Sequence, residues 1–260
     1  MKKQQKNIGN LKIFQTLITV NNRRLKNFQI NNPHLTDVQI TKGVPEEHIP
    51  SKELVNKRIV TKRFIEYRQT YPKGSVGNLY SIFNFLKKCS EEEIFILVFE
   101  DDAIIHPNLY EFIIYSWETI KVKDYICFGT NTDSFLQFLD PQNNLSFISF
   151  EDSFKYPNIN QIRNYFKLYN YKKINLKKII LGFGTSCFLV SPKGAKKILN
   201  LLFPLDLIPI NSIAHSKIIY TCSFDRGLNN IFNNLDAYLA YPFMSISPND
   251  NNKDIPSTDS

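Results

Sequence analysis

The sequence predicts an α/β fold, in which a central sheet is flanked by helices. The clearest sign is a run of six apolar residues, Ile94–Phe99, which suits a strand buried on both faces between two layers of helices. Hydrophobic residues make up 43% of the 260 residues, and they include 21 Phe and 13 Tyr, enough for a sizeable core. We therefore expect one domain over residues 1–247 and a polar, mobile tail at residues 248–260.

The N-terminal part begins with a predicted strand at Lys12–Val20, which leads into the polar loop Asn21–Arg24. A short alternating strand follows at Val38–Thr41 and ends at Lys42-Gly43. After a proline-containing loop, helical character begins at about Ser51. This part of the chain therefore alternates strand and helix, as expected for an α/β sheet.

A glycine-containing turn at Gly74–Gly77 precedes apolar residues that recur at helical spacing as far as Leu86. The pattern predicts a helix that opens at the turn and ends near Lys87-Lys88, directly before the apolar strand.

The second half of the chain contains further strand and helix signals around one segment without a clear period. Residues 131–178 are rich in Asn, Lys, Phe and Tyr, and we expect them to be irregular and to form a variable insertion. The other predicted elements are a helix at Asn108–Ile120, a strand at Lys123–Gly129, a strand at Gly182–Ser191, a helix starting at Pro192 and a short helix at Asp225–Asn234.

Three carboxylates, Glu100, Asp101 and Asp102, follow the apolar strand directly. At a period of two, Glu100 and Asp102 point to one side and Asp101 to the other. Ligands of open α/β sheets bind beyond the carboxyl ends of the strands. A carboxylate pair at that place suits a divalent cation that in turn holds a diphosphate, whereas the alternative is a solvated acidic loop.

Several classes of protein are not expected from the composition. The four cysteines, Cys89, Cys127, Cys187 and Cys222, are far apart and have neither zinc-ligand spacing nor the pattern of a disulfide framework. No apolar run approaches the roughly 18 residues that a membrane-spanning helix needs, and the N-terminus is a poor signal peptide. A cytoplasmic location is the resulting expectation.

The net charge of +8 is concentrated in the first third, since residues 1–80 contain 15 Lys or Arg and 5 Asp or Glu. Such an excess suits an anionic membrane surface, a phosphate-bearing small molecule or nucleic acid. No nucleic-acid-binding motif accompanies the charge, so we expect no nucleic acid and consider peripheral contact with the inner membrane.

Four short sequence blocks, spread over about residues 12–247, occur in the same order as in a known protein family. They are Gly74-Ser75-Val76-Gly77 followed by Ser81, Phe99-Glu100-Asp101-Asp102-Ala103, Phe188-Leu189-Val190-Ser191-Pro192-Lys193-Gly194-Ala195, and Asp225 followed by Tyr241-Pro242. Together they resemble glycosyltransferase family 25, the lipooligosaccharide and collagen galactosyltransferase group. The first block departs from the family pattern: Ser75 replaces the usual Glu, Asn78 the usual Cys and Ile82 the usual His.

The resemblance implies a GT-A-type, Rossmann-like domain with a mixed sheet, and an inverting transfer of a sugar, usually galactose, from a UDP-sugar with Mn²⁺. The acceptor would be a glycan such as lipopolysaccharide or lipooligosaccharide. Such a reaction needs a Lewis acid for the departing diphosphate and a base for the acceptor hydroxyl. Asp102 and Glu100 are the predicted metal ligands, and Asp225 and Asp101 the predicted catalytic residues.

Other roles follow from position. We expect Arg23, Arg24, Gly74, Gly77 and Glu100 to contact the nucleotide-sugar donor. Asp225 has an alternative interpretation as the N-cap of a helix, and Asp206 is the second candidate for the base.

Two other functions are compatible with the same residues. One is a degenerate relative that binds the nucleotide sugar without transfer, which the altered first block favours. The other is a metal-dependent phosphohydrolase, although such enzymes usually gather several His and Asp ligands and this chain has four His.

Overall fold

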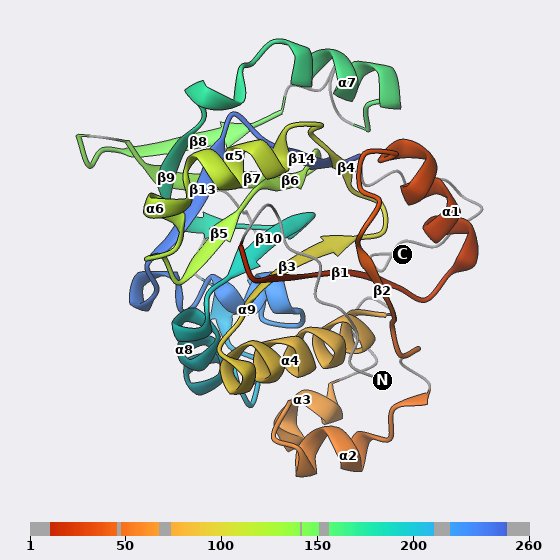
Figure 1. Ribbon diagram of the computed structural model, residues 1–260. Coiled ribbons are helices and arrows are strands. Elements are labelled where there is room, and N and C mark those ends of the chain that lie inside the picture. Colours follow the sequence, from red (N-terminus) through yellow and green to blue (C-terminus); the bar gives the residue numbers. More distant parts are fainter. Residues whose placement is uncertain are drawn as a thin grey trace.

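The protein is described here from a computed structural model, which covers residues 11–45, 48–67, 74–140, 142–150, 156–210 and 219–248. Its central feature is a mixed sheet (Figure 1). In spatial order the strands are β2 (Gln39–Lys42), β1 (Ile13–Thr19), β3 (Phe95–Glu100), β10 (Cys187–Val190), β5 (Tyr125–Cys127), β13 (Ala237–Tyr241), β9 (Asn175–Gly182), β7 (Phe135–Leu139) and β8 (Leu145–Ser149).

The strand directions place several strand ends at one edge of the sheet. β1 pairs in parallel with both β2 and β3, while β10 runs antiparallel between β3 and β5. β5 is therefore parallel to β3, and the carboxyl ends of β1, β3 and β5 share an edge. This edge carries the acidic residues that end β3.

Helices cover both faces of the sheet, and the predicted fold class is confirmed (Figure 1). The α-helices are α1 (Asn22–Asn31), α2 (Ser51–Asn56), α3 (Lys62–Glu66), α4 (Ser75–Glu92), α5 (Leu109–Tyr115), α6 (Trp117–Ile120), α7 (Ile159–Lys167), α8 (Pro192–Leu202) and α9 (Phe224–Leu228). Two 3₁₀ turns, η4 (Tyr171–Lys173) and η5 (Phe232–Asn234), complete the described helical elements.

Alternation along β3 produces the two cores. Ile96 and Val98 pack in the cluster that also contains α4 and α8, and Leu97 and Phe99 pack in the cluster with α5. All four side chains are at most 1% exposed, which confirms the prediction of a strand buried on both faces.

Two small sheets lie outside the main one. β4 (Ile104–Ile105), β14 (Ser245–Ser247) and β6 (Gly129–Asn131) form a three-stranded sheet, and β11 (Pro209–Ile210) pairs with β12 (Ile219–Tyr220). The first small sheet matters for the site because it begins two residues after Asp102.

The prediction of irregular structure at residues 131–178 is wrong. The segment contains β7, β8 and α7, and β9 begins near its end, so it extends the main sheet by hairpin pairing. The segment has no single hydrophobic period because its strands differ in burial. β7 is largely buried, whereas β8, the outermost strand of the sheet, alternates exposed and half-buried residues. Asp140 caps the β7–β8 turn through Asn144, a local signal that hydrophobic patterning does not show.

Several predicted boundaries also differ. The helix expected at Asn108–Ile120 is divided into α5 and α6 at Ser116. The strand expected at Gly182–Ser191 begins only at Cys187, and α4 continues to Glu92 because Cys89 is buried. The predicted tail lies almost wholly outside the described residues, as does the start of the basic N-terminal segment. Among the described residues, no helix has the length and apolar character needed to cross a bilayer.

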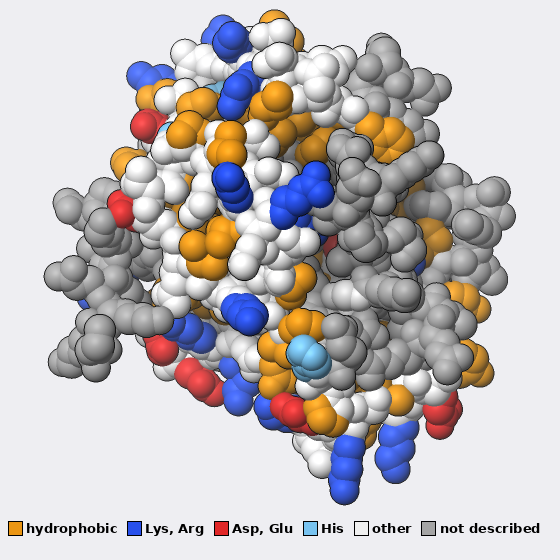
Figure 2. Space-filling view, turned by 90° about the vertical axis from the view of Figure 1, so that its right-hand side faces the viewer, with side chains coloured by type: hydrophobic (Ala, Val, Ile, Leu, Met, Phe, Trp, Pro, Cys, Tyr) orange, Lys and Arg blue, Asp and Glu red, His pale blue; other side chains and the backbone are white. Residues whose placement is uncertain are grey.

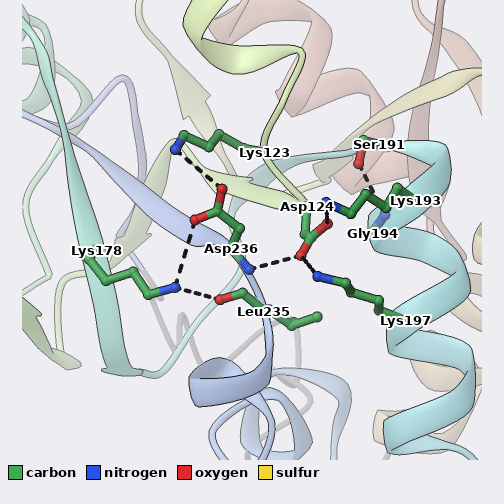
Figure 3. Close-up of polar contacts among 9 residues, drawn as sticks. All are labelled: Lys123, Asp124, Lys178, Ser191, Lys193, Gly194, Lys197, Leu235 and Asp236. Carbon is green, nitrogen blue, oxygen red and sulfur yellow. Dashed lines mark hydrogen bonds and ion pairs between the residues drawn. The ribbon is translucent and has the colours of Figure 1, made fainter.

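A buried carboxylate ties three elements together at the opposite edge of the sheet (Figure 3). Asp124, immediately before β5, is fully buried, and its Oδ2 atom accepts hydrogen bonds from the backbone N–H of Asp236 and from Lys197 of α8. Gly194 allows α8 to approach, since a Cβ at this position would lie 1.9 Å from the carbonyl oxygen of Asp124. Lys123 and Lys178 point toward Asp236 in the same view.

We expect Asp124→Asn to lower the free energy of unfolding by about 2 kcal/mol, because the change removes the charge that Lys197 faces in a buried site. Urea unfolding followed by circular dichroism measures the change. Glu118→Gln is the matched control. The side chain of Glu118 is 81% exposed and forms an ion pair with Lys121, so this variant should change the stability little. Equal stability of the two variants would contradict a structural role for Asp124.

Candidate active site

The acidic end of β3 is held by an arginine from the neighbouring strand-to-helix junction. Asp101 is 8% exposed, and its Oδ1 atom lies 3.0 Å from Nη1 of Arg24 in the first turn of α1. The Oδ1 atom of Asn21 caps this helix by accepting from the backbone N–H groups of Arg23 and Arg24. Burial raises the pKa of Asp101 to about 6, and the charge of Arg24 opposes that shift.

Glu100 occupies a different environment. Its Oε1 atom accepts a hydrogen bond of 2.7 Å from the hydroxyl of Thr185, in the loop before β10. Burial, together with the charges of Asp102, Asp225 and Asp101, raises the pKa of Glu100 to about 8. Glu100 is therefore mainly protonated at neutral pH as long as no cation lies beside it.

Asp102 is the third member of the acidic triplet. Its Oδ2 atom accepts a hydrogen bond of 2.9 Å from the hydroxyl of Ser247, while Nη2 of Arg24 lies 3.8 Å away. Its Oδ1 atom is buried and has no hydrogen-bond partner among the described residues. Buried carboxylate oxygens are normally paired, so this atom has capacity for a ligand from outside the chain.

Asp225 reaches the same region from α9. Its Oδ2 atom accepts a hydrogen bond of 3.0 Å from the backbone N–H of Gly184, and its Oδ1 atom accepts one from the hydroxyl of Ser223. Gly184 has a φ of +82°, a left-handed conformation that a residue with a Cβ rarely adopts. The N-cap of α9 is Ser223, so the alternative interpretation of Asp225 as the N-cap is wrong.

The site thus gathers three carboxylates from two segments that are far apart in sequence. Glu100 is bonded to Thr185, and Asp225 is bonded to the preceding residue, Gly184. Asp102 follows Glu100 by two residues, and the charges of Asp102, Asp225 and Asp101 all act on Glu100. Asp102 is bonded to Ser247, while Arg24 lies close to Asp101 and, at a longer distance, to Asp102.

A divalent cation at this site would have few ligands from the protein. Within the described ranges, no group of three or more His, Cys, Asp and Glu side chains is arranged to hold a metal ion. A cation that bridges to a diphosphate, however, uses only one or two carboxylates and takes its remaining ligands from phosphate and water. The unpartnered Oδ1 atom of Asp102 and the repulsion around Glu100 fit that arrangement.

The amide of Asn131 strengthens this fit. Asn131 ends β6, which pairs with β14 so that Asn131 lies opposite Ser247, the residue bonded to Asp102. Its Oδ1 atom is also buried and without a partner among the described residues. Carboxylate and amide oxygens such as these are hard donors of the kind that Mg²⁺ and Mn²⁺ prefer.

The remaining residues predicted to contact the nucleotide-sugar donor lie at the starts of two helices. Arg23 lies exposed at the start of α1, beside Arg24. Gly74 and Gly77 form the start of α4, where Gly74 has a φ of +87°. α4 leads directly into β3 and runs back along it, so this start lies toward the edge that carries Glu100 (Figure 1).

Asp206, the second candidate for the base, belongs to another part of the molecule. It accepts hydrogen bonds from the hydroxyl of Thr61 at 2.6 Å and from the backbone N–H of Leu207 at 2.8 Å. These bonds attach the start of α3 to the chain that follows α8. The contacts of Asp206 are accounted for by this structural role.

Sequence reasoning did not identify Thr185, Ser247 and Asn131 as site residues. Each is a polar residue without a charge or motif. Thr185 and Ser247 bond to carboxylates that are far away in the sequence, and Asn131 lies opposite Ser247 through the pairing of β6 with β14. The only sequence signal near them is Gly182-Phe183-Gly184, which marks the loop before Thr185.

Arg24→Gln should lower the free energy of unfolding by about 2 kcal/mol, because it leaves the carboxylate of Asp101 buried without its cation. Arg23→Gln removes the same charge from the adjacent, exposed position and should leave the stability nearly unchanged. Thermal and urea unfolding of both variants measure the difference. Similar losses in the two variants would contradict the importance of the Arg24–Asp101 ion pair.

Comparison with known families completes the description of the site. The family model of glycosyltransferase family 25 (LPS biosynthesis protein) matches residues 14–213, which include the acidic triplet and the loop before β10. Comparison with curated proteins gives no match. The match covers more than half of the chain and agrees with the Rossmann-like arrangement of a mixed sheet between helices. The chain therefore belongs to glycosyltransferase family 25.

Proposed function

We propose that this glycosyltransferase moves a hexose, with galactose as the expected sugar, from a UDP-sugar to a glycan acceptor such as lipopolysaccharide or lipooligosaccharide, with inversion at the anomeric carbon. The observation that carries the proposal is that Glu100 and Asp225 are bonded to two adjacent residues of the loop before β10, with Asp102 two residues after Glu100. A family of sugar transferases that bear carboxylates at this position supports the same chemistry.

The donor diphosphate would lie beyond the carboxyl ends of β1 and β3. The side chain of Arg23, exposed in the first turn of α1, can meet a phosphate there. Arg24 would contribute mainly through Asp101, since its guanidinium is already engaged. Gly74 and Gly77 would let the donor approach the start of α4 closely.

Asp102 and Glu100 would hold a divalent cation, with Mn²⁺ the expected ion, and the amide oxygen of Asn131 is a further ligand candidate. When bound, the cation neutralises the charge that develops on the departing diphosphate. The chain's own part is to keep these oxygens fixed: Thr185 orients Glu100, and Ser247 orients Asp102.

Asp225 is the proposed general base. The acceptor hydroxyl oxygen forms a bond to the anomeric carbon, its proton passes to the Asp225 carboxylate, and the bond from the anomeric carbon to the diphosphate oxygen breaks with its electron pair leaving on UDP. The bonds from Gly184 and Ser223 fix the orientation of the carboxylate while it is half-buried. Attack opposite the leaving group inverts the anomeric configuration.

A degenerate relative that binds the donor without transfer is the second candidate, because the first block departs from the family pattern. Two of the altered positions, Ser75 and Ile82, are buried in the packed face of α4, at 6% and 1% exposure. Ile82 lies in the core beside the sheet, so its effect on catalysis would have to act through packing. Turnover measurements decide between these two candidates.

The first test is UDP release from a panel of UDP-sugars, with and without Mn²⁺, for the wild type, Asp102→Asn and the control Glu118→Gln. We expect Mn²⁺-dependent turnover of one sugar, at least about 100-fold lower in Asp102→Asn and unchanged in the control. The anomeric proton coupling of the product, measured by NMR, should show inversion.

Mn²⁺-dependent binding of UDP without turnover of any sugar, tested with a panel of glycan acceptors, would favour the degenerate relative. Turnover that is equal with and without a divalent cation would contradict the assignment of Asp102 and Glu100 as metal ligands.

Asp225→Asn should lower kcat by about 100- to 10,000-fold, because the amide cannot accept the acceptor proton, while KM for the UDP-sugar stays within about twofold. Asp206→Asn provides the comparison, since it should destabilise the protein and leave kcat near that of the wild type. The opposite result, loss of kcat in Asp206→Asn only, would transfer the role of base to Asp206.

A further inference from the structure

A second cavity lies close to the carboxylate site but is not part of it. It has a volume of about 520 Å³ and is formed by the chain after α1, by the β4–α5 junction and by the C-terminal half of α7. Among the residues that line it are Arg163, Lys167, His34, His106, Phe166 and Tyr169. Its volume is typical of cavities that bind a small molecule or a sugar unit.

The cavity shares a wall with the candidate active site. β4, which lines the cavity, starts two residues after Asp102 and pairs with β14, whose Ser247 is bonded to Asp102. Asn32 fixes the end of α1 to the same wall: its side chain donates to the carbonyl oxygen of Ala103 at 2.9 Å and accepts from the backbone N–H of Ile105 at 2.7 Å. The cavity is therefore held in a defined position relative to Asp102.

Two cations of α7 border this cavity. Arg163 and Lys167 are four residues apart, so they lie on the same side of the helix, and both are exposed. Neither has an acidic partner among the described residues, and like charges at this spacing repel. Figure 2 shows basic and hydrophobic side chains intermixed at the top of the molecule, where α7 lies in Figure 1. The unpaired cations suit an anionic group.

The histidines of the wall supply hydrogen-bonding groups instead of charge. The Nδ1 atom of His106 accepts from the backbone N–H of Asn108 at 3.0 Å, so its Nε2–H donates to the carbonyl oxygen of Phe166 at 3.3 Å and joins α7 to the β4–α5 junction. Burial lowers the pKa of both His34 and His106, with Glu111 acting in the opposite direction. The buried Nε2 atom of His34 has no partner among the described residues, which indicates a polar group supplied from outside the chain.

Aromatic rings form the apolar part of the cavity. The ring of Phe166 lies 5.1 Å from that of His106, and Tyr169, 39% exposed, follows α7 at the cavity rim. Aromatic faces pack against the C–H groups of a sugar ring, whereas the neighbouring cations select for negative charge. The combination differs from a plain surface patch of lysines because both kinds of group line the same open cavity.

We propose that this cavity binds an anionic sugar unit of the acceptor glycan, with its phosphate or carboxylate between Arg163 and Lys167 and its ring against Phe166 and Tyr169. The assignment to the acceptor rests on the proposed function, whereas binding of an anionic sugar does not. The cavity would then determine which glycans present a hydroxyl group to the carboxylate site across the β4 wall.

Calorimetric titration with glucose 6-phosphate, without any nucleotide sugar, tests the cavity by itself. We expect saturable binding that weakens at least about tenfold in Arg163→Gln/Lys167→Gln, since charge-assisted hydrogen bonds are lost. The control Lys172→Gln/Lys173→Gln removes the same charge from the exposed turn η4 and should bind like the wild type. Circular dichroism confirms that both double variants are folded.

Four results would overturn the proposal: no saturable binding, equal affinity in the wild type and the Arg163/Lys167 variant, binding of inorganic phosphate as tight as that of the sugar phosphate, and competitive displacement by UDP. The last result would assign the cavity to the donor.

In the transfer reaction, the Arg163/Lys167 variant should raise KM for an anionic acceptor and leave KM for the UDP-sugar unchanged. Absence of turnover in every protein would count against the proposed function alone, because the titration does not depend on it.

Discussion

The ion pair between Arg24 and Asp101 is the interaction on which the acidic edge of the sheet depends. A strand as apolar as β3 carries its last residues into a buried position, and three adjacent carboxylates there repel one another. Arg24 lies in the first turn of α1, which follows the neighbouring parallel strand β1, so the pairing of β1 with β3 brings its charge to Asp101. With Asp101 neutralised, Glu100 and Asp102 are left for chemistry.

The same edge is completed by hydroxyl and amide groups that belong to other strands. Thr185 holds Glu100 from the loop before β10, and Ser247 holds Asp102 from β14. These donors leave one oxygen of Asp102 unpaired, together with that of Asn131. The carboxylates are thus kept in place while one of their oxygens stays unpaired among the described residues, as the proposed cation site would require.

The small sheet β4–β14–β6 links this site to the cavity beneath α7. β4 begins two residues after Asp102, and both of its residues, Ile104 and Ile105, line the cavity, so a ligand in the cavity and a donor at the carboxylates would lie on either side of the same short segment. Asn32, 1% exposed, keeps that wall attached to α1. Donor and acceptor sites built on a shared rigid element can hold two substrates in a fixed relative orientation.

The sequence by itself determined the fold class, the two-sided burial of Ile94–Phe99 and the position of the acidic triplet, because these depend on local apolar patterning and on where a strand ends. It also contained the blocks that the family shares. Tertiary structure decided which carboxylates meet, that Arg24 engages Asp101, and that Thr185, Ser247 and Asn131 belong to the site. It also decided that residues 131–178 extend the sheet, because the pairing of β7, β8 and β9 cannot be predicted from the local hydrophobic pattern. Long-range strand pairing brings these groups together, and no period or motif within a short window encodes it.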